Sequence, residues 1–203
     1  MTGTFFRPLL ITVSAPSGAG KTTLCERLLA GAERIVYSVS CTTRAPRGDE
    51  VDGRDYVFLT DAQFEAYVRR GRFLEHAVVH GHRYGTLADT VRDAMHAGRH
   101  VLLDIDVQGA GQIREKLDGL PEDDLLKAGF VDIFIAPPSM EDLRRRLESR
   151  GEDAPETIER RLANAEKEMA RAGEYRYRIV NDKLEDAYRR LREIVRHEET
   201  TAS

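Results

Sequence analysis

The chain has 203 residues, enough for one substantial hydrophobic core, and its 41% hydrophobic and 33% charged residues are typical of a soluble domain. The net charge of −4 argues against a nucleic-acid-binding domain, so any basic patch must be local. No apolar run reaches 18 residues and residues 1–7 lack the architecture of a signal peptide, so we expect no membrane partner. A monomer and a small homo-oligomer both fit the sequence.

The two cysteines favour a reducing compartment. Cys25 and Cys41 lack the CxxC spacing of a metal or redox motif, and they stand in no secretory context. We therefore expect free thiols and a cytoplasmic protein.

A short buried strand, a glycine-rich loop and a helix are the first elements that the sequence predicts. Residues 9–14 read L-L-I-T-V-S, an apolar and β-branched run typical of a buried strand. Residues 23–29 place Leu24 and Leu28 on one face of a helix. The loop between them, at residues 15–22, reads A-P-S-G-A-G-K-T.

This loop has the pattern of a phosphate-binding loop. Gly18 and Gly20 let the backbone turn tightly, so that successive N–H groups point inward at an anion. Lys21 would reach the β- and γ-phosphates of a nucleotide, and the Thr22 hydroxyl would hold Mg²⁺. A glycine-rich turn that happens to precede a lysine is the alternative, but strand, loop and helix in register favour the phosphate site. Ala15 replaces the usual first glycine, which is acceptable if its φ is negative.

Short strands and one helix are expected between residues 35 and 86, where they interrupt the rhythm of the flanking chain. Thr60 can cap the helix, Phe64 would lie on its inner side, and Gly71 would end it. A polar, turn-rich stretch at residues 41–53 precedes it. After a strand at residues 35–40, we expect an inserted lobe over about residues 38–86, with a helix at residues 60–70 and strands at residues 56–59, 73–79 and 83–85.

Core strands and helices alternate from residue 88 onward. Residues 101–105 read V-L-L-D-I, an apolar run of the type that is buried on both faces of a parallel sheet. Residues 118–129 are expected to form a polar connection. The alternation predicts an α/β fold with three layers around a parallel sheet. The other expected elements are strands at residues 131–136 and 178–181 and helices at residues 88–97, 109–117, 137–150, 156–172 and 184–197.

Beyond the phosphate loop, the chain contains five unusual motifs. They are S-x-S-x-T-T-R-x-P-R from Ser38, F-L-E-H-A from Phe73, Y-G-T from Tyr84, L-D-I-D-x-Q-G from Leu103 and I-A-P-P-S from Ile135. Together with the loop they closely resemble guanylate kinases, the nucleoside monophosphate kinases that make GDP from GMP and ATP. The resemblance spans about residues 9–195 and says nothing of the connection at residues 118–129.

The resemblance implies a three-layer P-loop kinase with a parallel core sheet, an inserted GMP-binding lobe and a helical lid. The core would comprise about residues 1–37, 87–143 and 173–203, the lobe residues 38–86, and the lid residues 144–172. The reaction implied is direct in-line transfer of the γ-phosphoryl group of ATP to GMP, and to dGMP, in purine nucleotide recycling. Mg²⁺ would accompany ATP, and no covalent nucleophile is required, because positioning and charge neutralisation supply the catalysis.

The same resemblance assigns the binding residues by position. Those expected to bind ATP are Ala15, Pro16, Ser17, Gly18, Ala19, Gly20, Lys21, Thr22, Thr23 and Asn181. Those expected to bind GMP are Ser40, Arg44, Arg47, Tyr56, Glu75, Tyr84, Thr86 and Asp106. The expected catalytic group is Lys21, Arg44, Arg146, Arg150 and Arg161.

The chemistry of two arginines and two tyrosines suits a phosphate. Arg44 and Arg47 flank Pro46 in a polar turn, and two guanidinium forks fit a dianionic phosphate. Tyr56 and Tyr84 could each add a hydroxyl donor. Taken alone, the arginines could equally be solvated and the tyrosines half-buried strand residues. The resemblance favours a joint grip on the GMP phosphate.

Glu75 lies among apolar residues of an expected strand, where a carboxylate is unusual unless it is paired. Guanine offers N1–H and a 2-amino group side by side, and a carboxylate can accept hydrogen bonds from both. Ser40 could donate to guanine O6, and Asp106 could contact the amino group. A strand residue that faces solvent is the alternative for Glu75, and the resemblance favours base recognition.

Asp104 and Asp106 close the apolar strand that begins at Val101, where P-loop enzymes place a magnesium-linked carboxylate. We assign Thr22 and Asp104 to the metal shell, with Asp104 acting through water. A cap on the following helix is the alternative role for these aspartates. The histidines near residue 80 are not expected to bind a metal, because no cysteine or acidic partner has ligand spacing.

Arg146, Arg150 and Arg161 flank a break at residues 151–155 and match the phosphate-contacting arginines of the lid in the resembled family. A positive lid that closes over ATP would stabilise charge on the transferring phosphoryl group and exclude water. The alternative is a solvated helix face on which the arginines pair with nearby glutamates.

Two rival functions can be set against the kinase. A guanylate-kinase-like scaffold module would bind peptides without catalysis and would be expected to lack a working phosphate loop, whereas this chain retains Lys21 and Thr22. A kinase for another phosphorylated small molecule would lack the base-reading set of Ser40, Glu75 and Asp106.

Overall fold

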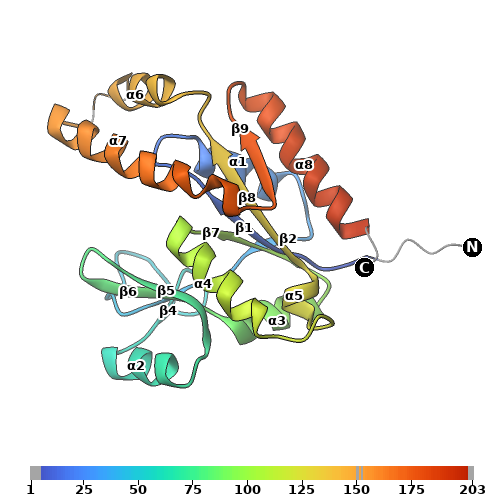
Figure 1. The fold of residues 1–203 in the computed structure, drawn as a ribbon. Helices are drawn as coiled ribbons and strands as arrows, with labels where there is room; N and C mark the ends of the chain where they lie inside the picture. The colour runs from blue at the N-terminus through green and yellow to red at the C-terminus, as the bar shows by residue number, and fades with distance from the viewer. Residues whose placement is uncertain (1–5, 150, 152, 201–203) are drawn as a thin grey trace, which may run out of the picture.

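A parallel sheet forms the centre of the computed structural model, which describes residues 6–149, 151 and 153–200 (Figure 1). Within these residues the sheet has five strands in the order β2-β7-β1-β8-β9, and each neighbouring pair is parallel. The strands are β1 (Leu10–Ser14), β2 (Ile35–Tyr37), β7 (His100–Asp104), β8 (Phe130–Ala136) and β9 (Tyr177–Val180). The predicted α/β class and parallel core sheet are confirmed.

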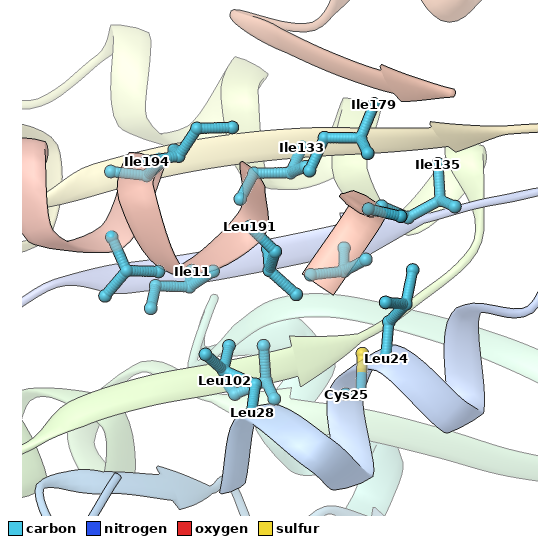
Figure 2. Packing of buried hydrophobic residues seen from close by; sticks show 14 of the residues in the cluster. Ile11, Leu24, Cys25, Leu28, Leu102, Ile133, Ile135, Ile179, Leu191 and Ile194 are labelled. Carbon is cyan, nitrogen blue, oxygen red and sulfur yellow. The ribbon is translucent and has the colours of Figure 1, made fainter. Parts of the chain in front are cut away.

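Helices α1 (Lys21–Ala30) and α8 (Leu184–Thr200) cover one face of this sheet. Figure 2 shows this packing, in which Leu191 of α8 lies near Ile11 of β1 and Leu28 of α1 lies near Leu102 of β7. Every residue of β1 is buried, because apolar side chains on both faces of the strand meet helices.

The opposite face is covered by α3 (Ala88–His96), α4 (Val107–Asp118) and the short α5 (Leu125–Ala128). The buried side chains of this layer that come from helices are Val91, Met95, Ile113, Leu117 and Leu126. They pack on Leu10, Val101 and Leu103 of the sheet. The two helical layers and the sheet make the three layers that the alternation predicted.

A second, mixed sheet comes from residues 41–87. In the described chain its order is β4-β3-β6-β5, with β3 (Cys41–Thr42), β4 (Val57–Phe58), β5 (Phe73–Val79) and β6 (His82–Leu87). Helix α2 (Asp61–Arg69) covers it, burying Phe64 against Phe73. Thr60 caps α2 as predicted, in a capping box with Gln63.

The strand expected at residues 35–40 is shorter in the structure, where β2 of the parallel sheet ends at Tyr37. β3 of the mixed sheet starts at Cys41, inside the stretch that was expected to be a polar turn. Residues 38–40 carry the chain from one sheet to the other, so the predicted strand was three residues too long.

The polar connection expected at residues 118–129 contains α5. Asp124 caps this helix, since its carboxylate accepts a hydrogen bond from the Leu126 N–H at 2.9 Å. Leu126 fills the core beneath α4. This one-turn helix was not predicted, because a single buried leucine in an acidic stretch gives no periodic hydrophobic pattern.

Helices α6 (Met140–Ser149) and α7 (Pro155–Ala170), with a 3₁₀ turn at Ala172–Glu174, follow β8. Leu143 and Leu147 pack against Ile158 of α7. Figure 1 shows α6 and α7 on the same side of the molecule as the mixed sheet. None of the described helices is long and apolar enough to span a bilayer.

Candidate active site

The glycine-rich loop lies between the carboxyl end of β1 and the start of α1, as predicted. Gly18 and Gly20 have φ values of 93° and 90°, in the left-handed region that favours glycine. Ala15 is not among the described residues with positive φ, so its side chain imposes no backbone strain. Because α1 begins at Lys21, its first N–H groups point toward the loop, where a helix favours an anion.

A cleft of about 350 Å³ opens over this loop. Asp106 at the start of α4 and Glu168 on α7 belong to its wall, so segments far apart in sequence enclose it. The loop residues that line it are Ala15, Pro16, Ser17, Gly18, Gly20, Lys21, Thr22 and Thr23. Ala19 is instead buried in the hydrophobic core.

Asn181 supports the loop from within the protein. It is buried, and its side-chain N–H donates to the Ala19 carbonyl at 2.8 Å. Its own carbonyl accepts a hydrogen bond from the Arg146 guanidinium at 2.8 Å. A Cβ at Gly20 would collide with the Asn181 amide, so this glycine is needed for close approach as well as for its φ.

The Lys21 ammonium points to the carboxyl end of β7. It forms an ion pair with Asp104, and it lies 3.3 Å from the Ile105 carbonyl. Thr22 is exposed in the first turn of α1. The structure therefore brings a hydroxyl and a carboxylate close to the loop lysine, and such oxygen ligands are those that Mg²⁺ prefers.

No cluster of three or more His, Cys, Asp or Glu side chains within the described chain could hold a metal ion. A cation at the loop would have to take most of its ligands from phosphates and water, which is the usual arrangement for Mg²⁺ with a nucleotide.

Asp106 caps helix α4 while it lines the cleft. Its Oδ1 accepts hydrogen bonds from the N–H groups of Gln108 at 2.9 Å and Gly109 at 2.8 Å. Its second carboxylate oxygen makes no hydrogen bond to any described residue. The capping role that the sequence left open is present, and one oxygen remains for a ligand.

Arg44 is buried, with 7% of its side chain exposed, and is not a solvated surface residue. Its guanidinium makes two hydrogen bonds to the Glu50 carboxylate, at 3.0 and 2.8 Å. Its Nε donates to the Tyr84 hydroxyl at 3.3 Å, and the group lies over the Tyr56 ring. Arg47 is exposed nearby, so four of the predicted phosphate contacts gather around one turn.

Glu75 on β5 is buried, with 9% exposure, and does not face solvent. Its Oε1 accepts a hydrogen bond from the Thr86 hydroxyl at 2.7 Å. Burial is the main cause that raises the pKa of Glu75, and the nearby Asp106 charge adds to it. Ser40 is half-buried just before β3 of the same sheet. The structure thus holds a buried carboxylate that is paired with the Thr86 hydroxyl through one of its two oxygens.

Two of the three arginines that were expected to belong to a lid have partners among the described residues. Arg146 binds the Asn181 carbonyl, and Arg161 pairs with Asp153 at 2.9 Å. Arg150 lies outside the described residues. Arg161 on α7 thus pairs with an aspartate in the loop that joins α6 to α7.

Glu168 belongs to the cleft, although the sequence analysis missed it. It is half-buried, and its pKa is raised chiefly by that burial, with a contribution from Asp106. Glu168 follows the buried Ala165 by three residues, which places the two on neighbouring positions of α7. That spacing is a weak signal in the sequence, because the apolar pattern of the helix continues at Met169.

Comparisons with known proteins agree with this arrangement. The family model for guanylate kinase matches residues 7–198. A guanylate kinase of Ruegeria pomeroyi is 49% identical over 189 residues, covering 93% of this chain and 85% of that protein. One from Anaeromyxobacter dehalogenans is 49% identical over 191 residues, covering 94% and 80%. The crystal structure of guanylate kinase from Anaplasma phagocytophilum superimposes with a TM-score of 0.66 at 34% identity, covering 97% of this chain and 88% of that one.

Proposed function

The chain belongs to the guanylate kinase family, and from this premise we propose how its residues divide the work of the reaction. The enzyme transfers the γ-phosphoryl group of ATP to GMP, giving ADP and GDP. The peptide-binding scaffold is not favoured, because curated guanylate kinases share about half of the residues over most of the chain and the loop lysine is retained.

The phosphate loop, residues 15–23, would bind the phosphates of ATP. Successive backbone N–H groups and the amino end of α1 supply partial positive charge, and Lys21 supplies a full one. In the structure Lys21 forms an ion pair with Asp104. We infer that the ATP phosphates replace Asp104 as the partner of Lys21, while Asn181 keeps the loop backbone in place.

The mixed sheet would bind GMP, and the single observation that carries this proposal is the buried carboxylate of Glu75. One oxygen is held by Thr86, so the other is left for guanine N1–H and the 2-amino group. Asp106 offers its free oxygen to the amino group, and Ser40 could donate to O6. A buried, partly satisfied carboxylate is costly for folding, which a guanine ligand would offset.

The phosphate of GMP would be bound by Arg44, Arg47, Tyr56 and Tyr84. Arg44 is already oriented by Glu50 and by the Tyr84 hydroxyl. Because its side chain is ordered before GMP arrives, less conformational entropy is lost on binding. The phosphoryl acceptor is thus held at a defined place beside the ATP cleft.

A divalent metal accompanies the nucleotide, and we propose Mg²⁺, with Thr22 and Asp104 as the residues that would hold it. The hydroxyl and carboxylate oxygens fit this cation. When bound, Mg²⁺ neutralises charge on the β- and γ-phosphates. The chain itself contributes orientation and fixed positive charge.

Residues 144–172 would act as a lid over ATP. Arg146 and Arg161 would move from Asn181 and Asp153 to the transferring phosphoryl group, and Arg150 would join them. Closure would exclude water, which otherwise competes with GMP as the acceptor. We place the enzyme in the cytoplasm, where its two free and buried cysteines, Cys25 and Cys41, stay reduced.

A panel of nucleoside monophosphates tests the proposal. ATP turnover, followed by coupled release of ADP, is measured with GMP, dGMP, AMP, CMP and UMP, and without an acceptor. We expect strong turnover with GMP, measurable turnover with dGMP and little with AMP, because adenine has neither N1–H nor a 2-amino group for Glu75. Equal use of AMP and GMP would contradict the assignment of the mixed sheet.

A further inference from the structure

Helix α4 touches the backbone of the strand that carries Glu75. The Gln112 side-chain amide accepts a hydrogen bond from the His76 N–H at 3.0 Å and donates one to the His76 carbonyl at 3.0 Å. β5 is an edge strand of the mixed sheet. The Gln112 amide therefore forms hydrogen bonds with both backbone polar groups of His76, as a neighbouring strand would.

The same face of α4 borders the Glu75 carboxylate. Gly109 precedes Gln112 by three residues, and such residues are neighbours on a helix surface. A Cβ at Gly109 would lie 3.3 Å from Glu75 Oε2 and 3.6 Å from Asp106 Oδ1. The residue bound by Gln112 is next to Glu75 in sequence, so the contact lies beside the proposed guanine recess.

Two carboxylates from different sheets must stay close for the guanine 2-amino group to contact both. Glu75 belongs to the mixed sheet, and Asp106 follows β7 of the parallel sheet. Both carry negative charge in their ionised forms, so electrostatic repulsion tends to separate them. A contact that ties β5 to α4 opposes that separation.

We propose that Gln112 is a positioning residue for guanine recognition, which fixes Glu75 relative to Asp106 by binding the backbone of His76. The inference rests on the proposed function of Glu75 and names a residue that acts through it. Gln112 itself touches no substrate. Its loss lets β5 shift on α4, and a misplacement of about 1 Å is enough to weaken recognition by up to about 100-fold.

The test compares Gln112→Met, which keeps the side-chain length but makes neither hydrogen bond, with a matched change one turn further along α4. Lys116 donates to the carbonyls of Gly71 and Phe73, so it also ties α4 to the mixed sheet, at the start of β5 and not at the residue that follows Glu75. Lys116→Met removes that contact. Steady-state kinetics with GMP and with IMP, which lacks the 2-amino group, are measured together with thermal unfolding.

For Gln112→Met we expect the KM for GMP to rise about 10-fold, kcat to change by less than about 3-fold, and the KM for ATP to stay constant. The preference for GMP over IMP should fall by about 10-fold, because the two carboxylates no longer meet the amino group together. Lys116→Met should lower the unfolding temperature and leave that preference unchanged.

An unchanged preference in Gln112→Met, or an equal fall in Lys116→Met, overturns the inference and leaves the proposed function standing. A wild type that does not prefer GMP overturns both. If Gln112→Met does not fold, Gln112→Asn decides in its place. Its amide is one methylene too short for both contacts, so the same fall in preference is expected and an unchanged preference refutes the inference.

Discussion

Replacing Glu75 by glutamine tests the base-reading site most directly. The carboxylate can only accept hydrogen bonds, and guanine presents two donors to it. In the structure Thr86 donates to Oε1 at 2.7 Å, which leaves Oε2 on the side of Gly109 and Asp106. Glu75→Gln keeps the shape, but it introduces a donor where only acceptors fit.

The expected loss follows from these contacts. If the amide oxygen turns to guanine and the amide nitrogen to Thr86, one charge-assisted hydrogen bond is lost, at about 1.5–3 kcal/mol. If the amide nitrogen of the substituted side chain faces guanine instead, its N–H group meets a guanine N–H group. The loss of binding free energy is then at least about 3 kcal/mol. We expect kcat/KM for GMP to fall on the order of 10²-fold, corresponding to about 3 kcal/mol.

Folding should survive this substitution. Burial raises the pKa of Glu75, so the ionised carboxylate is less favourable in the folded than in the unfolded chain. A neutral amide removes that cost, and we expect the unfolding temperature to stay the same or to rise. A fall in activity would then report on recognition and not on stability.

The assay is steady-state kinetics with GMP and AMP for wild type and variant, with ATP binding measured separately by calorimetry. ATP affinity should stay nearly constant, because the phosphate loop is a different site. The interpretation is refuted if Glu75→Gln loses as much affinity for ATP as for GMP, or if the wild type uses AMP as well as GMP.

Three further predictions concern the loop and the core. Lys21→Ala should lower turnover by at least about 100-fold, because losing one contact to the transferring phosphates raises the barrier by several kcal/mol. Circular dichroism checks that the variant is folded. Near-normal turnover in a folded variant would contradict the assignment of the phosphate loop. Ala15→Gly should lower the free energy of unfolding in urea by about 0.4–1 kcal/mol and change turnover little; a large gain in activity would show that Ala15 distorts the loop. Burial lowers the pKa of His100 below its ordinary 6.5, so the unfolded chain binds the proton more readily, and stability should fall as pH drops below about 6.5. In the His100→Gln variant the free energy of unfolding, measured by urea titration between about pH 5 and 7.5, should fall less steeply with decreasing pH. The same pH dependence in variant and wild type would refute this role of His100.

Local patterns in the sequence identified most of the elements. The phosphate loop was predictable because strand, glycines, lysine and helix are contiguous, and each has a local physical role. Helix α2 was predictable from Thr60 at its start, and the core strands from continuous apolar runs. The end of β2 at Tyr37 was missed, because the apolar and β-branched pattern in the sequence continues beyond it to residue 40.

For the polar residues of the site, the sequence revealed less and the tertiary structure more. Residue type alone left Arg44 and Glu75 open between surface and site, and only their resemblance to a family favoured the site. The structure shows both side chains buried, Arg44 against Glu50 and Glu75 against Thr86. Glu168 was missed because its inward direction depends on how α7 packs above the loop.

The sequence by itself determined the phosphate loop, the alternation of strands and helices, and the kinds of side chain available for two nucleotides. These properties depend on neighbours within a few residues, through backbone sterics and hydrophobic periodicity. Only the tertiary structure decided that the Asn181 amide holds the Ala19 carbonyl and that Gln112 binds the strand of Glu75. Such contacts join distant segments, and their distances are set by the packing of whole layers against the common sheet.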